Sequence, residues 1–163
     1  MNSKFRNENF NSKVHLFTWN PENWPHLTDE LISATILVLH DGSVISNQWS
    51  VGGRKNNIEV DDSFFLLRQG SDRRGIIAAG KVTSEIFQAP HWDGSNKETT
   101  YVKYSLSEMV TVDCRLPIED LETYFVDNSL DIDWNQIYSS GKTLSDRDAE
   151  ELCRLWEKHL TTL

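Results

Sequence analysis

One stretch of the sequence, residues 47–70, carries residue types that could build a binding site. It opens with an aromatic ring, a hydroxyl, two glycines and two cations, namely Trp49, Ser50, Val51, Gly52, Gly53, Arg54 and Lys55. Glycines let the backbone turn tightly or approach a bound group closely. Trp49 would then stand at the mouth of a pocket that faces a flat, anionic molecule. The alternative is that Trp49 caps a hydrophobic core and the glycines form an ordinary turn.

Residues for catalysis or metal binding do not form a recognisable motif. The sequence has no phosphate-binding glycine loop, no nucleophile elbow and no His cluster of a nuclease. Asp61 and Asp62 could bind Mg²⁺, but they precede a central strand, as turn residues do. Cys114 and Cys153 are isolated, as reduced cysteines of a cytosolic protein are. We therefore expect a cytoplasmic binding module that is not an enzyme and that needs neither a cofactor nor a metal.

Length and composition predict one folded domain. The chain has 163 residues, a hydrophobic fraction of 38% and six tryptophans, which suits a single core. Residues 1–12 are polar and are expected to be flexible. No apolar run is long enough for a membrane span, and we expect no membrane partner.

The net charge of −9 is unevenly distributed. Residues 117–151 contain ten acidic and two basic residues, whereas residues 52–81 contain six basic and four acidic ones. This distribution disfavours strong non-specific binding to DNA, but it leaves room for a local basic face.

Short strands and loops must position the first stretch. Residues 14–19 predict a strand that ends at the turn signal Asn20-Pro21. Thr28 is predicted to cap a helix whose body, residues 31–39, is apolar nearly all round and is therefore expected to be mostly buried.

The rest of the chain adds core strands and a final helix. Residues 63–68 predict a strand covered on both faces, and the glycine inside the strand at 75–84 indicates a bulge or a close approach. Residues 101–105 and 109–114 predict two further strands. Ser145 with Asp148 fits a helix cap. The expected fold class is α+β, with five or six mostly antiparallel strands and flanking helices.

Several segments carry a resemblance to a known family when they are taken in order. They are LFTWNP at 16–21, WSVG at 49–52, VDD and FFLLRQG within 60–70, and GIIAAG at 75–80. This order resembles the EVE domain of the PUA-like superfamily, which also holds the YTH readers of methylated adenine. WNQ at 134–136, SG at 140–141 and a helix with Trp156 are similar to EVE-like domains of modification-dependent restriction endonucleases. The resemblance covers roughly residues 13–160 of an expected domain at 13–163, although Asp61-Asp62 replaces the usual acidic-glycine pair.

The resemblance implies a PUA-like mixed β pseudo-barrel that binds double-stranded DNA and receives a flipped, modified base in an aromatic cage. The base would be 5-methylcytosine or 5-hydroxymethylcytosine, with 6-methyladenine as a further option. Trp49 would form one wall, Trp92 a second wall, and Asn20 a polar contact. The pocket residues are then Trp19, Asn20, Trp49, Ser50, Val51, Gly52, Trp92 and Asp93. The DNA backbone would meet Arg54, Lys55, Arg68, Arg73, Arg74 and Lys81.

Three readings remain open for the function. The first is the specificity domain of a modification-dependent restriction endonuclease, with a nuclease domain fused at its C-terminal side. The second is a reader of modified RNA, and the third is a protein-interaction domain that uses the acidic C-terminal face. Core packing is the expectation for Trp19 and Trp24, and Arg73-Arg74 could be a solvated loop tip.

Overall fold

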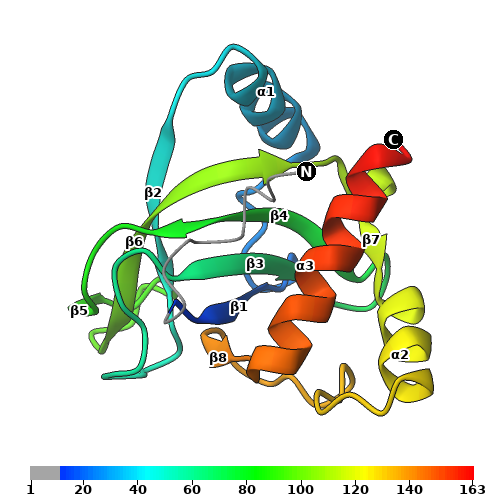
Figure 1. The fold of residues 1–163 in the computed structure, drawn as a ribbon. Helices are drawn as coiled ribbons and strands as arrows, with labels where there is room; N and C mark the ends of the chain where they lie inside the picture. The colour runs from blue at the N-terminus through cyan, green and yellow to red at the C-terminus, as the bar shows by residue number, and fades with distance from the viewer. Residues whose placement is uncertain (1–11) are drawn as a thin grey trace.

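The computed structural model describes residues 12–163 (Figure 1). The segment expected to be flexible, residues 1–12, lies outside this range except for its last residue. The elements are, in order, β1 (Val14–Trp19), α1 (Asp29–His40), β2 (Ile45–Ser50), β3 (Ser63–Arg68), β4 (Gly75–Val82), β5 (Phe87–Pro90), β6 (Glu98–Met109), the 3₁₀ turn η1 (Val112–Cys114), β7 (Leu116–Pro117), α2 (Ile118–Asp127), β8 (Lys142–Thr143) and α3 (Asp146–Thr161).

The strands form one mixed sheet of eight strands. Its main path runs in the order β2-β6-β4-β3-β1-β8, while β5 pairs with β6 and β7 pairs with β4. β1 and β3 are parallel, and the other pairs are antiparallel. In Figure 1, α1 lies near β2 and β6, whereas α2 and α3 lie together on the other side. The expected α+β class with a mixed sheet and flanking helices is confirmed.

The strand prediction was right for β1, β3 and β4 but wrong elsewhere. β2 and β5 were not predicted, and the sheet has eight strands where five or six were expected. β7 and β8 have only two residues each. Residues 101–105 and 109–114 do not form two strands, because a single twelve-residue strand, β6, is followed by η1. β6 continues because β2, β5 and β4 all pair with it along its length.

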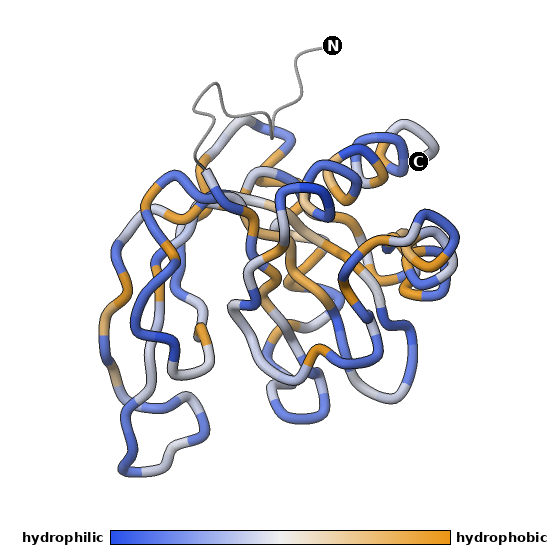
Figure 2. The backbone as a smooth tube through the Cα atoms, turned by 60° about the horizontal axis from the view of Figure 1, so that its bottom comes forward, coloured by the Kyte–Doolittle hydropathy of each residue, from blue (hydrophilic) through white to orange (hydrophobic). Residues whose placement is uncertain are grey.

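The core lies where the central strands meet α3. Every residue of β3 is buried, as its apolar run predicts. Phe17 stacks on Phe64 with ring centroids 4.5 Å apart, and Phe65 meets Trp156 of α3 edge to face. Figure 2 shows the hydrophobic segments gathered in these central strands. Dense packing here fixes the ends of β1 and β3, from which the loops described below emerge.

The two predicted helix caps are present. Thr28 Oγ1 accepts from the Leu31 N–H at 3.2 Å, and Ser145 Oγ accepts from the Asp148 N–H at 3.2 Å. The Asp148 carboxylate also accepts from the N–H groups of Asp131 and Ile132. The cap of α3 therefore also ties down the loop before β8.

The expectation that α1 is mostly buried was wrong. Only Ile32 is buried in this helix, and Leu37 is 68% exposed. α1 contacts β6 and the edge strand β2, so a single face has a partner in the described chain. Burial of an apolar helix is favourable, but the sequence of the helix does not determine whether another element lies against it.

Asp61 and Asp62 have structural roles, as turn residues. Asp61 has φ +74°, a left-handed conformation that aspartate tolerates better than most residues. Asp62 is buried, and its carboxylate accepts from the N–H groups of Lys13 and Glu59 and pairs with His15 Nε2 at 2.7 Å. Within residues 12–163, no group of three His, Cys, Asp or Glu side chains is arranged to hold a metal ion.

Candidate functional site

A pocket of about 1290 Å³ opens where the loops after β1, β2 and β5 meet the segment before β8. Its lining comes from seven parts of the chain, and the aromatic members are Trp19, Trp24, Trp49, Trp92, Tyr101, Tyr104 and Tyr138. The parallel pairing of β1 with β3 sends residues 20–24 and 69–71 to the same edge of the sheet. Segments that are distant in the sequence therefore share one site.

Three indoles form the accessible aromatic surface of this pocket. The rings of Trp24 and Trp92 stand nearly at right angles, at 84°, with centroids 6.0 Å apart. Trp49 is half-buried against the core, and its Nε1 donates to the Thr18 carbonyl at 3.1 Å. Walls at right angles offer one ring face for stacking and one edge for lateral contact.

Trp19 supports this arrangement from beneath. It is buried, and its Nε1 donates to the Trp24 carbonyl at 2.8 Å, which fixes the loop that carries Trp24. The Arg68 guanidinium lies over the Trp19 ring, 5.5 Å from its centroid. The core-packing expectation for Trp19 is confirmed, although the residue also lines the pocket.

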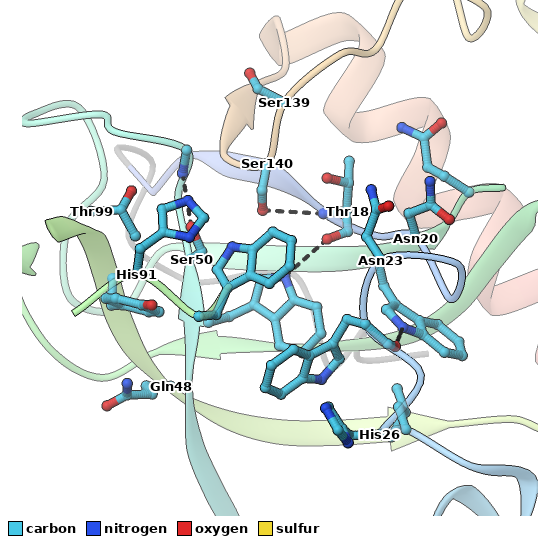
Figure 3. Close-up of a pocket in the computed structure, with 18 of the residues that line it drawn as sticks. Thr18, Asn20, Asn23, His26, Gln48, Ser50, His91, Thr99, Ser139 and Ser140 are labelled. Atoms are coloured by element: carbon cyan, nitrogen blue, oxygen red, sulfur yellow. Dashed lines mark hydrogen bonds between the residues drawn. The ribbon is translucent and has the colours of Figure 1, made fainter. Parts of the chain in front are cut away.

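Polar groups surround the indoles and retain hydrogen-bonding capacity. Figure 3 shows Ser50, His91 and Thr99 on one side of the rings and Asn20 and Asn23 on the other. Asn20 Oδ1 accepts from the Glu22 N–H at 3.0 Å, which leaves its NH₂ group available.

Two carboxamides and two phenols of the lining make no side-chain hydrogen bond within the described part of the chain. They belong to Asn23, Gln48, Tyr104 and Tyr138. Carboxamides can donate and accept at once, and they match the edge of a nucleobase.

The pocket lining is almost without charge. Its ionisable members are Glu22, the imidazoles of His26 and His91, and the tyrosines, and the described lining contains no Lys or Arg. Burial raises the pKa values of Tyr101 and Tyr104, so both phenols keep their protons at neutral pH. The lining therefore suits a neutral, flat, polar group, and the two cations expected at the rim, Arg54 and Lys55, directly follow the lining residue Gly53.

The structure brings six of the eight predicted pocket residues together and leaves two outside. Trp19, Asn20, Trp49, Ser50, Gly52 and Trp92 line the pocket. Val51 does not, because its side chain is fully buried in the core and its backbone N–H donates to the Thr100 carbonyl. Asp93 does not either, because its carboxylate turns back to the Ser95 N–H and to His91. The Ser95 hydrogen bonds lower the pKa of Asp93.

The cations predicted to contact the DNA backbone differ in where the structure places them. Arg68 was a wrong prediction, because it is 5% exposed and its guanidinium donates to the carbonyls of Asp72 and Arg73 inside the loop. Arg54 and Lys55 directly follow the pocket rim, and Arg54 Nη2 donates to Ser139 Oγ at 3.4 Å.

The remaining predicted cations are held by other parts of the fold. Arg73 is exposed and pairs with Asp72 and Asp113, and Arg74 donates to Gln69 and to the Trp134 carbonyl. Lys81 is half-buried within β4, beside Ser63 and Ser105 of the neighbouring strands. Of the six predicted cations, Arg54 and Lys55 are placed best to meet a ligand that enters the pocket.

The sequence reasoning missed four aromatic members of the site. Trp24 was interpreted as core, Tyr101 and Tyr104 as parts of an ordinary strand, and Tyr138 was not considered. Trp24 lies in the same loop as the predicted pocket residue Asn20, and this proximity could have identified it as a pocket residue. Tyr138 lies in a polar irregular segment, the same context that singled out Trp92.

No helix within residues 12–163 has the length and apolar character needed to cross a lipid bilayer. No family model matches the sequence. No curated protein matches it either.

Solved structures, in contrast, are similar to this chain over most of its length. Human THYN1, in a complex with DNA that contains 5-methylcytosine, superposes with a TM-score of 0.57 at 16% identity, over 88% of this chain and 97% of its own. A hypothetical protein from Leishmania major gives 0.59 at 13% identity, over 91% and 97%. The Mmi1 YTH domain gives 0.52 at 11% identity, over 93% and 100%. At these identities the likeness concerns the fold, and the chain has the mixed α+β, PUA-like fold of these proteins.

Proposed function

We propose that this protein is a reader that holds one modified nucleobase in the indole-lined pocket. The observation that carries the proposal is the right-angled pair Trp24 and Trp92 beside Trp49, inside a lining with almost no charge. A nucleobase is flat, neutral and edged with donors and acceptors. Ring faces would bind its plane, and the available carboxamides of Asn23 and Gln48 would bind its edge.

The energetics explain why stacking and polar contacts are both needed. Extruding a base from a duplex costs a few kcal/mol, and stacking on an aromatic side chain returns about 1–3 kcal/mol per base. One added methyl contributes about 0.8 kcal/mol, or roughly a fourfold preference. Stronger discrimination must come from hydrogen bonds that the wrong base leaves unmade.

The finer proposal is a base in duplex DNA, 5-methylcytosine or 5-hydroxymethylcytosine, with 6-methyladenine as the next choice. THYN1, which has the same fold, was solved with DNA containing 5-methylcytosine, and this supports the first choice. A modified base in RNA is the alternative, since the YTH domain also has this fold.

A binding titration tests the proposal directly. Fluorescence anisotropy would compare duplexes and single strands that carry cytosine, 5-methylcytosine, 5-hydroxymethylcytosine, adenine or 6-methyladenine at one position. We expect the wild-type protein to prefer a modified cytosine in duplex DNA, and Trp49→Ala to abolish the preference while leaving the fold intact. Competition with modified single-stranded RNA separates the DNA reader from the RNA reader.

Two further variants keep the test informative if Trp49→Ala is destabilised through the loss of its core contacts. Trp92 is 39% exposed, so Trp92→Ala removes a wall with little effect on folding. Val126→Ala, at a 77% exposed position of α2, serves as the matched control. Unchanged selectivity in Trp92→Ala and Trp49→Ala would contradict the cage, and no affinity for any oligonucleotide would favour the protein-interaction reading.

A broader part of the proposal concerns the cellular role. We propose that the protein acts in the cytoplasm as a binding module and not as an enzyme, and that it directs a nuclease domain to modified DNA. Similarity of residues 134–141 and Trp156 to EVE-like domains of restriction endonucleases supports this role. Transformation with plasmids that do or do not carry 5-methylcytosine, into cells with and without the natural full-length protein, tests it.

A further inference from the structure

Tyr138 is the most exposed of the large hydrophobic residues in the described chain. Its side chain is 85% exposed, yet it lines the mouth of the pocket. Within residues 12–163 its ring contacts no other aromatic ring, and its hydroxyl has no hydrogen-bond partner. A phenol ring in this position contributes almost nothing to the stability of the folded chain.

The segment that carries Tyr138 is held firmly on both sides. Gln69 Nε2 donates to the Ile137 carbonyl at 2.9 Å, and Ile137 itself is buried. The Thr18 N–H donates to Ser140 Oγ at 3.1 Å, and the Gly141 N–H donates to the Leu16 carbonyl at 2.7 Å. An unpacked ring is therefore presented from a fixed backbone, so little backbone entropy remains to be lost when the ring meets a ligand.

The surroundings of Tyr138 distinguish two uses of an exposed ring. Proteins that bind single strands by stacking use successive aromatic rings along a groove. Here the only other exposed Phe, Tyr or Trp among residues 12–163 is Trp92, whose ring already contacts His91 and Trp24. A solitary unpacked ring at the mouth of the pocket fits a wedge that enters a duplex at one step.

We propose that Tyr138 inserts into the duplex and fills the space vacated by the base that the pocket receives. This inference rests on the proposed function and adds the device that makes the protein a duplex reader. The ring stacks on the base pairs on either side of the gap, and the hydroxyl remains at the polar edge, near the unpaired partner base. Flipping leaves a gap in the stack that costs a few kcal/mol, and the stacked ring recovers part of that cost.

The test compares one modified base in two contexts. Affinities would be measured for the modified duplex and for the same modified strand alone, with wild type, Tyr138→Ala and Tyr138→Phe. We expect Tyr138→Ala to weaken duplex binding at least about fivefold, the equivalent of about 1 kcal/mol of stacking, and to change single-strand binding by less than about twofold. Tyr138→Phe keeps the ring and should retain most of the duplex affinity.

The outcomes separate this inference from the function on which it rests. Equal losses of affinity for duplex and single strand in Tyr138→Ala would make Tyr138 a stacking platform for single strands and would overturn the wedge. Unchanged duplex affinity in Tyr138→Ala would overturn it as well. If the wild type prefers the modified single strand and loses that preference in Trp92→Ala, the reader function stands whatever Tyr138→Ala does. If the wild type shows no preference in either context, the proposed function itself fails.

Discussion

The indole N–H groups of Trp19 and Trp49 both donate to main-chain carbonyls, so these residues offer only ring surface to a ligand. Trp49 therefore both caps the core and lines the pocket, and the two interpretations of its sequence context are compatible. Base identity must then be read by side chains with unused donors and acceptors, such as Asn23 and Gln48. Stacking on an aromatic ring tolerates every base and supplies affinity without selectivity.

At the residue scale, a buried histidine makes stability depend on pH. His15 is fully buried between Asp62 and Thr143, and burial lowers its pKa below 6.5, against the opposing hydrogen bond and charge of Asp62. At pH values between the lowered pKa of the folded state and 6.5, the unfolded chain binds more protons than the folded chain. The free energy of unfolding therefore decreases as the pH falls through this range. Urea unfolding from about pH 8 to about pH 5 should show this loss. His15→Gln removes the titrating group, and an unchanged pH slope in that variant would contradict the assignment.

At the element scale, β4 shows why its sequence contains an interior glycine. Its interior glycine predicted a bulge or a close approach, and both are present at Gly80. The register with β6 shifts between Ala79 and Gly80. A Cβ at Gly80 would stand 2.2 Å from the Ser105 carbonyl oxygen and 2.8 Å from Phe64. Glycine is required there so that β4 can lie against β6 and Phe64 at the same time.

Gly80→Ala should therefore destabilise the fold by about 1–3 kcal/mol, the usual cost of overpacking a core. The cost should exceed that of an ordinary helix or strand substitution, because the clash is with backbone that cannot rotate away. Gly42→Asn is the matched control, since Gly42 has φ +78° and no atom near its Cβ position, and asparagine tolerates that conformation. Thermal or urea unfolding of the two variants measures the difference, and equal stabilities would refute the close-approach explanation.

At the scale of the whole molecule, a net charge of −9 limits non-specific attraction to nucleic acid. The pocket carries almost no charge, and Arg54 and Lys55 are the cations placed directly beyond its rim. Each duplex phosphate contact contributes about −0.9 to the slope of log K against log salt. A protein with few such contacts should bind with a shallow slope and should depend mostly on the pocket.

The double variant Arg54→Gln/Lys55→Gln should reduce the magnitude of this slope by about 2, with the preference for the modified base retained. Titrations at two or more salt concentrations measure it. Lys158→Gln, at an exposed position near the end of α3, is the control and should leave the slope unchanged. If the double variant loses the base preference, these cations take part in base recognition and do not only contact the DNA backbone.

The sequence alone determined the features that depend on neighbours along the chain. The buried strand at residues 63–68, the caps at Thr28 and Ser145, the interior glycine and the turn at Asp61 follow from short-range patterns and local hydrogen bonds. Trp49 was nominated from the order of segments that resembles the EVE domain, and Trp92 because it stands in a polar loop beside Asp93 and Gly94.

Only the tertiary structure decided which distant segments meet. The pairing of β1 with β3 and with β8 brings Trp24 and Tyr138 to one pocket mouth, although they are far apart in the sequence. The same packing turned Arg68 inward over Trp19 and left the apolar residues of α1 largely exposed. A side chain's type fixes what it can bind, but its exposure and its partners depend on sheet order, which arises from long-range contacts that no local pattern records.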